Sequence, residues 1–117
     1  IDGHSFPNKP LAVDLNQQAN RPDICLGTDS FHTPQQLIDD CTELFSNAGF
    51  SVHVNQPYAG TMVPLKYYGK DSRVSSILIE VNRRVYLRNE PIDLVKTDVF
   101  FDVQRTIQEI ISSIYLY

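Results

Sequence analysis

The chain has 117 residues, of which 42% are hydrophobic and 21% are charged, and its formal net charge is −4. This balance is typical of one globular domain with a buried core, so we expect a single domain over residues 1–117. A net negative chain offers no basic face to a phosphate backbone, no apolar run approaches the ~18 residues needed to cross a bilayer, and no signal-peptide pattern opens the sequence. We therefore expect a soluble, cytoplasmic protein that binds neither nucleic acid nor membrane.

The opening run, Ile1–Pro7, carries two ionisable side chains in a segment that is typical of a strand. Asp2 and His4 are two positions apart, so in an extended chain both project to the same side of the backbone. A neutral imidazole is the commonest metal ligand in proteins, and a carboxylate beside it can fix its tautomer. The alternative is a solvent-exposed histidine next to a turn-capping aspartate, and this short pattern alone does not exclude it.

Residues 8–22 are rich in proline and polar residues and predict an ordered loop. The short apolar run Asp23–Gly27 then predicts a strand. Arg21, just ahead of this strand, could clamp a carboxylate through two hydrogen bonds or remain a solvated surface residue. We expect Cys25 and Cys41 to be buried free thiols.

The next segment has the signals of a helix start and a helix stop. Thr33 is predicted as the N-cap, Pro34 as the first helical residue and Gln36 as the second member of a capping box. Apolar residues recur at helical spacing up to Gly49, which is expected to end the helix. Phe50–Asn55 alternates apolar and polar residues and predicts a strand. Strand, helix and strand in this order predict a βαβ unit with parallel strands.

Residues 55–73 form a long irregular stretch in which prolines and glycines alternate with tyrosines. Connections of this length inside a compact domain are usually binding loops or lids. Lys66 and the tyrosines are the groups there that could hold an anionic or polar substrate, and the alternative is a loop packed by its own aromatic rings. His53, which precedes the stretch, is expected to be a surface residue.

Val74–Val81 contains a continuous apolar run and predicts a central strand that is buried on both faces. Glu80 interrupts this run near the carboxyl end of the strand. Desolvation would raise the pKa of Glu80 and suit it to act as a general base near neutral pH. Alternatively, Glu80 marks the point where the strand leaves the core, or it pairs with Arg83 or Arg84.

A second helix is predicted after Thr97 or Asp98, either of which can cap it. Its core-facing residues recur at intervals of three and four, and they are Val99, Phe100, Val103, Ile107, Ile110, Ile111 and Ile114.

Four of these runs, in their order and approximate spacing, resemble the N-formylglutamate amidohydrolase family. They are Asp2–Pro7, Arg21–Asp29, Asn55–Gly60 and Ile79–Tyr86. The resemblance implies an α/β fold similar to that of the carboxypeptidase and aspartoacylase group, a zinc-exopeptidase-like three-layer αβα sandwich around a mixed, largely parallel sheet.

The resemblance also implies a function. The implied protein is a zinc-dependent amide hydrolase that acts on the N-formyl or N-acyl amide of an acidic amino acid, which is a small-molecule substrate. His4 resembles a zinc ligand of the family, Asp2 would orient His4 through a hydrogen bond, and Glu80 resembles the carboxylate that takes a proton from the metal-bound water and passes it to the leaving amine. The residues that would bind the substrate are Asn55 and Tyr58, with Arg21, Lys66 or Arg83 as the partner of its carboxylate.

The family pattern has further zinc ligands, a histidine and an acidic residue in an N-terminal motif, and this sequence lacks that motif. We therefore expect the C-terminal half of such an enzyme, incomplete at its N-terminus and inactive by itself. An exposed sheet edge would then favour a homodimer. The alternative is a non-catalytic α/β binding or interaction module that keeps the scaffold after losing the metal site.

Overall fold

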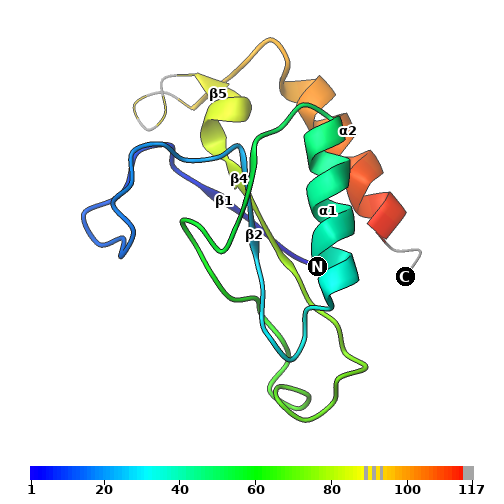
Figure 1. Cartoon of the computed structure of the whole chain (residues 1–117). Coiled ribbons are helices and arrows are strands. Elements are labelled where there is room, and N and C mark those ends of the chain that lie inside the picture. Colours follow the sequence, from blue (N-terminus) through cyan, green and yellow to red (C-terminus); the bar gives the residue numbers. More distant parts are fainter. Residues whose placement is uncertain (89, 91, 93, 115–117) are drawn as a thin grey trace.

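The computed structural model describes residues 1–88, 90, 92 and 94–114 (Figure 1). In chain order its elements are β1 (Asp2–Phe6), β2 (Ile24–Gly27), α1 (Gln35–Asn47), β3 (Val52–Val54), β4 (Leu78–Asn82), a 3-10 turn (Arg83–Val85), β5 (Leu87–Arg88), β6 (Val95–Lys96) and α2 (Phe100–Ile114). Neither described helix is both long enough and apolar enough to span a membrane.

The main sheet has four strands in the order β1-β4-β2-β3. β1 runs parallel to β4 and β2 runs parallel to β3, whereas β2 and β4 are antiparallel. The predicted α/β fold with a mixed sheet is confirmed, as are the central position of β4 and the parallel βαβ unit of β2, α1 and β3. β5 and β6 form a separate two-stranded antiparallel ribbon.

Both helices pack on the same face of the main sheet, where they stand side by side (Figure 1). The buried cluster between them and the sheet combines Ile24, Leu26, Ile77 and Ile79 with Leu37, Cys41 and Phe45 of α1 and Ile110 and Ile114 of α2. The described helices thus form one layer. The opposite face of the sheet is left to the loop segments and to the polar side chains of β1 and β4.

The predicted ends of the helices are partly right. Gly49 ends α1 as expected, with φ +92° and with its N–H donated to Ser46 O while the N–H of Phe50 reaches Phe45 O. The predicted capping box is wrong, because Pro34 is the N-cap and α1 has no side-chain cap. The Thr33 hydroxyl instead donates to Ser76 O at 2.7 Å, so it joins two distant segments.

The start of α2 also differs from the prediction, since the Thr97 hydroxyl is buried without a partner among the described residues and the Asp98 carboxylate pairs with Arg88. The apolar stripe is confirmed at its C-terminal end, where Ile110 and Ile114 are buried. Cys25 and Cys41 are buried free thiols, as predicted, and burial raises the pKa of Cys41 to about 11.

Gly27 allows a loop to approach the sheet closely. A Cβ atom added there would lie 2.2 Å from the carbonyl oxygen of Gly60 and 2.7 Å from the side chain of Leu78. The segment that contains Gly60 crosses the face of the sheet opposite the helices. This segment can therefore lie against β2 only because residue 27 is a glycine.

We expect Gly27→Ala to lower the free energy of unfolding by about 1–3 kcal/mol, because the clash is with backbone and no rotamer change relieves it. Gly3→Ala is the matched control, since a Cβ at Gly3 would meet nothing within 4 Å. Urea denaturation of the two variants and the unmodified chain measures the difference. Equal stability of Gly27→Ala and Gly3→Ala would contradict the close approach.

Candidate active site

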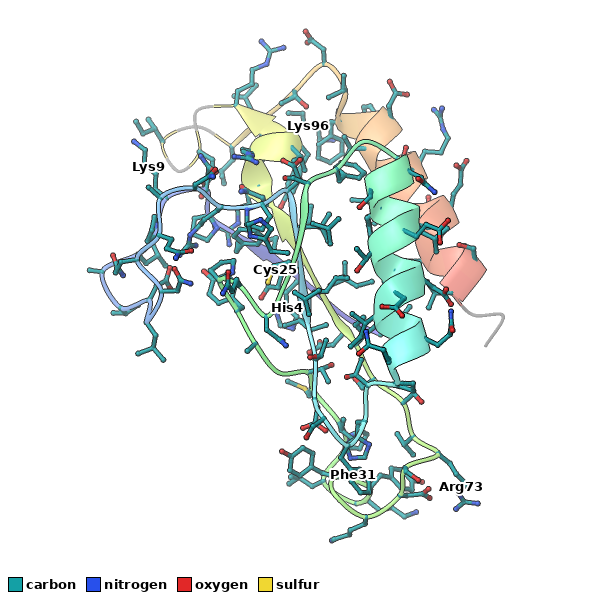
Figure 2. The ribbon with its side chains drawn as sticks, in the orientation of Figure 1. His4, Lys9, Cys25, Phe31, Arg73 and Lys96 are labelled. Carbon is teal, nitrogen blue, oxygen red and sulfur yellow. The ribbon has the colours of Figure 1, made fainter. Side chains whose placement is uncertain are left out.

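The pairing of β1 with β4 brings together the three residues singled out by the sequence. His4 lies opposite Glu80 and Asp2 lies opposite Leu78 in the parallel ladder. Neighbouring strands are ~4.8 Å apart, and residues two apart on a strand share a face. Asp2, His4 and Glu80 therefore occupy one face of the sheet, the face that the helices leave free. Figure 2 labels His4 on β1, the edge strand that lies beside β4.

His4 and Asp2 form a direct contact. Nε2 of His4 lies 2.9 Å from Oδ1 of Asp2, with the imidazole about half exposed. If the ring is neutral, this contact assigns the proton to Nε2, because a carboxylate can only accept. The lone pair of Nδ1 is then free to bind another group, as in histidines that a carboxylate orients toward a metal.

The negative charge of the Glu80 carboxylate is poorly stabilised by hydrogen bonds in the described part of the chain. Its Oε2 atom is buried and has no hydrogen-bond partner in the described part of the chain. Burial raises the pKa of Glu80, His4 opposes this rise, and the charge of Asp2 adds to it. The alternative in which Glu80 pairs with an arginine is not seen, because Arg83 pairs with Glu90 and Arg84 pairs with Asp23.

A cavity of about 510 Å³ opens beside these side chains. Asp2, His4 and Glu80 form its polar side, and Leu78 adds an apolar contact from β4. The remaining wall comes from residues 59–63, Leu65 and Tyr68, in the loop between β3 and β4. The long loop thus lines this cavity, and its role in binding stays a prediction.

Hydrogen bonds hold the first part of this wall against the sheet. The Cys25 thiol donates to Tyr58 O at 3.2 Å, and the Ser76 hydroxyl donates to Met62 O at 2.8 Å. The Thr61 hydroxyl lies 2.8 Å from the same Ser76 oxygen. Ser76 was not predicted as a site residue, and a single serine before an apolar strand carries no pattern that would single it out.

His32 holds the second part of the wall. Its Nδ1 lies 2.7 Å from Val74 O, and its Nε2 accepts the N–H of Gly69 at 2.9 Å. The buried imidazole also stacks on Tyr68, with ring centroids 5.7 Å apart. Figure 2 shows this region at the lower end of the molecule, around Phe31. His32 thus serves as a structural anchor, whereas His53 is exposed on β3, as predicted.

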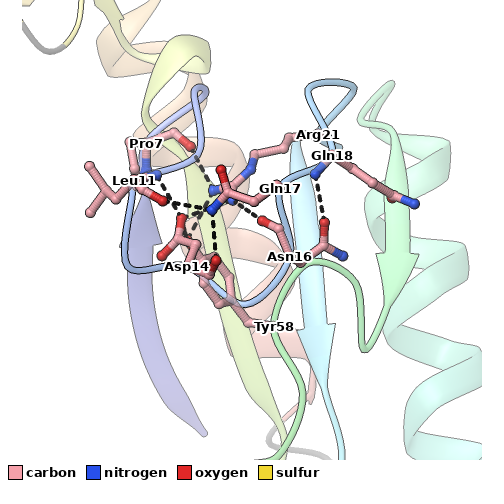
Figure 3. Close-up of polar contacts among 8 residues, drawn as sticks. All are labelled: Pro7, Leu11, Asp14, Asn16, Gln17, Gln18, Arg21 and Tyr58. Carbon is pink, nitrogen blue, oxygen red and sulfur yellow. Dashed lines mark hydrogen bonds and ion pairs between the residues drawn. The ribbon is translucent and has the colours of Figure 1, made fainter.

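Arg21 lies outside the cavity, in a buried network that joins two loops (Figure 3). Its guanidinium donates to Asp14 Oδ2 at 2.9 Å, to Tyr58 Oη at 2.9 Å, and to the carbonyl oxygens of Pro7 and Asn16. The N–H of Leu11 is the main cause of the lowered pKa of Asp14, and Arg21 adds to it. The carboxylate that Arg21 clamps in this structure is therefore Asp14, and its role toward a substrate stays a prediction.

The other predicted substrate-binding residues are also outside the described lining of the cavity. Asn55 exchanges hydrogen bonds with Thr28, through its side-chain oxygen at 2.9 Å and its side-chain nitrogen at 2.7 Å. The Lys66 ammonium lies over the ring of Tyr67, and the Arg83 guanidinium donates to Ser5 Oγ at 3.2 Å. The described residues that line the cavity include none of the five predicted substrate-binding residues, which are Arg21, Asn55, Tyr58, Lys66 and Arg83.

The donors for a zinc ion form a partial set. His4 offers one nitrogen and Asp2 holds it, but zinc in proteins normally has three or four protein ligands. No group of three or more His, Cys, Asp or Glu residues that could hold a metal is found among residues 1–88, 90, 92 and 94–114. The described residues can therefore supply one ligand of a zinc site, but they do not form a complete site.

The chain is similar to known proteins in sequence and in fold. The family model described as N-formylglutamate amidohydrolase matches residues 1–87. The crystal structure of N-formylglutamate amidohydrolase from Ralstonia eutropha JMP134 is similar to this fold, with a TM-score of 0.69 and 24% sequence identity. The alignment covers 92% of this chain and 40% of that one, so the chain spans less than half the length of that protein. No curated protein matches.

We expect His32→Phe to lower the free energy of unfolding by about 1–3 kcal/mol, because the ring is kept but the partners of Gly69 N–H and Val74 O are lost. His53→Phe, at an exposed position on β3, is the control. Urea denaturation gives the stability, and hydrogen exchange at the Gly69 amide tests whether the loop opens. Unchanged exchange at Gly69 in His32→Phe would show that the imidazole does not hold this loop.

Burial raises the pKa of Glu80 above its ordinary value of 4.5, so the folded chain binds this proton more tightly than the unfolded chain. The contribution of Glu80 to the free energy of unfolding is fully present below pH 4.5, and it is lost as the pH rises through the pKa of Glu80 in the folded chain. Without added metal, we expect Glu80→Gln to be more stable than the unmodified chain at about pH 7 and to lose this advantage near pH 4.

Urea denaturation at both pH values, with Glu109→Gln on the exposed side of α2 as the control for removal of a charge, measures this change. A stability advantage that is the same at both pH values would contradict a raised pKa for Glu80.

Proposed function

The chain belongs to the N-formylglutamate amidohydrolase family, and on this premise we propose that Asp2, His4 and Glu80 form one side of an active site that hydrolyses an N-formyl or N-acyl amide. The observation that carries the proposal is the pairing of His4 with Glu80 across β1 and β4, beside an open cavity. The His4 imidazole is thereby held beside the Glu80 carboxylate, whose Oε2 has no hydrogen-bond partner among the described residues.

Glu80 is the proposed general base. A base works best when its pKa lies near the working pH, and burial raises the pKa of Glu80 in that direction. The Glu80 carboxylate can take a proton from the attacking water and then deliver it to the amide nitrogen as the carbon–nitrogen bond breaks. The products are a carboxylic acid, which is formic acid for a formyl group, and a free amine.

Asp2 and His4 are the proposed metal-binding side. Asp2 keeps the proton of His4 on Nε2, which leaves Nδ1 as the ligand atom. A bound zinc ion would lower the pKa of a water molecule to ~7 and polarise the amide carbonyl. The other ligands of that ion are proposed to come from outside the described residues, on the same polypeptide or on a partner.

The proposed partner is a second copy of the chain, because β1 and β3 are the edge strands of the main sheet and an open edge can pair with another strand. The cytoplasm is the proposed location. A non-catalytic binding module is the second candidate function, and the partial donor set in the described residues favours it.

Zinc content and amide hydrolysis test these candidates. They are measured for the 117-residue chain and for the longest natural polypeptide that contains it. We expect about one zinc ion per site in the longer protein, and we expect Glu80→Gln to keep the metal while hydrolysis falls by roughly 10²–10⁴-fold. Glu109→Gln is the control and should keep both.

Two outcomes would decide against the hydrolase. Full activity of Glu80→Gln would exclude Glu80 as the base. Absence of zinc and of hydrolysis from every form of the protein would favour the binding module.

A further inference from the structure

The strand that carries Asp2 and His4 has little apolar pattern of its own. Among the five residues of β1, Asp2–Phe6, only Phe6 is buried in the described structure. The register of a strand is set mainly by its apolar side chains, so a polar strand that contains glycine has a weakly specified register. A slip of two residues would keep every side chain on its face, but it would move His4 by about 6.6 Å along β4. The alignment of His4 with Glu80 therefore needs a further source of specificity.

A buried asparagine at one end of the sheet supplies such specificity. Asn82 is the last residue of β4, lies opposite Phe6 of β1 and is fully buried. Its side-chain nitrogen donates to Asn8 Oδ1 at 3.1 Å and to Pro22 O at 3.0 Å. Its side-chain oxygen accepts the N–H of Arg84 at 3.1 Å. One side chain thus joins the end of β4 to the segment that follows β1 and to the segment that precedes β2.

Arg84 joins the same segments from the solvent side. Its Nη1 donates to Asn8 Oδ1 at 3.2 Å, while its Nε and Nη2 donate to Asp23 Oδ1 at 3.1 Å and 2.9 Å. β4 lies between β1 and β2 in the sheet, so these bonds run to both of its neighbours (Figure 1). This strand-end network consists of Asn8, Asp23, Asn82 and Arg84.

We infer that the strand-end network positions the proposed active site, because it holds the register in which His4 lies opposite Glu80. This inference rests on the proposed amide hydrolysis and assigns positioning residues to it. Asn82 lies two residues after Glu80, and Asn8 lies four residues after His4. A slip of β1 along β4 would take Asn8 away from the Asn82 amide and leave a buried donor without its acceptor, which is costly. Misplacement of a reacting group by ~1 Å can cost about 10²-fold in rate.

Asn8 offers the sharpest test of this role. It is half-buried, lies beyond the end of β1 and accepts both bonds through the same Oδ1 atom. Asn8→Ala removes this acceptor, whereas Asn8→Asp keeps an acceptor oxygen for both donors. With N-formyl-glutamate as the substrate of the longest natural polypeptide, we expect Asn8→Ala to lower kcat by about 10–100-fold with little change in KM. Asn8→Asp should keep kcat.

Ser51→Ala is the matched structural control. Ser51 bonds Asp23 and Ile24 at the border of β2 and β3, so its loss should lower the midpoint of urea denaturation and leave kcat unchanged. Arg84→Met should lower kcat as Asn8→Ala does. Arg73→Met, which breaks an arginine–aspartate pair outside the strand-end network, should leave kcat unchanged.

The register is measured separately, by cross-strand NOEs between backbone protons of β1 and β4 in the same polypeptide, whether or not it is active. We expect the NOEs of the unmodified protein and of Asn8→Asp to pair Gly3 with Ile79. In Asn8→Ala these NOEs should weaken or be joined by NOEs from a shifted register.

The outcomes separate this inference from the proposed function. Unchanged kcat or unchanged NOEs in Asn8→Ala would overturn the inference and leave the hydrolase in place. A loss of kcat that Asn8→Asp does not restore, or that Ser51→Ala reproduces, would also overturn it, because such a loss reports general destabilisation. If no form of the protein releases formate, the hydrolase is excluded, and the NOEs alone decide whether the network holds the register.

Discussion

The pairing of β1 with β4 is the constraint on which the rest of the site depends. Parallel alignment of these strands sets His4 beside Glu80 and leaves Asp2 within hydrogen-bond distance of the imidazole. A shift of one residue in this ladder would turn the side chains of β1 to the helix face, because side chains alternate along a strand. The site therefore needs one register, and in this register Phe6 of β1 is buried against the ring of Tyr58.

One face of the sheet stabilises the fold, and the other face carries the candidate active site. On one face both helices bury an aliphatic cluster, and on the other face the side chains of β1 and β4 remain partly polar and partly open. A buried carboxylate without a partner costs free energy, and such costs are typically found where a group has a task other than packing. Arg21 shows the opposite solution, since it is buried but is paired with Asp14 and three further oxygen acceptors.

Elements with a local signal could be predicted from the sequence. Helical spacing located both helices, Gly49 marked the end of α1, and the apolar run before Glu80 indicated a central strand. The resemblance of four short runs identified Asp2, His4 and Glu80 as candidates that the sheet then places together. Their chemical roles remain predictions.

Contacts between distant segments could not be predicted in this way. Thr33 has the signal of an N-cap, but its hydroxyl bonds Ser76, which is far along the chain. Arg21 has the signal of an exposed arginine, and its burial depends on Asp14 and Tyr58 in two different loops. His32 lies in no recognisable motif because its partners are backbone groups of Gly69 and Val74. Contacts of this kind depend on the tertiary structure, so no local sequence pattern predicts them.

The pairing of β1 with β4 also affects the order of folding. β2, α1 and β3 are neighbours in the chain and can form early, whereas β1 must wait until β4 has been synthesised. During that interval the segment with Asp2 and His4 lacks the strand with which it pairs in the folded chain. The candidate active site thus depends on a contact between segments that are far apart in the chain, which is the kind of contact that forms slowly during folding.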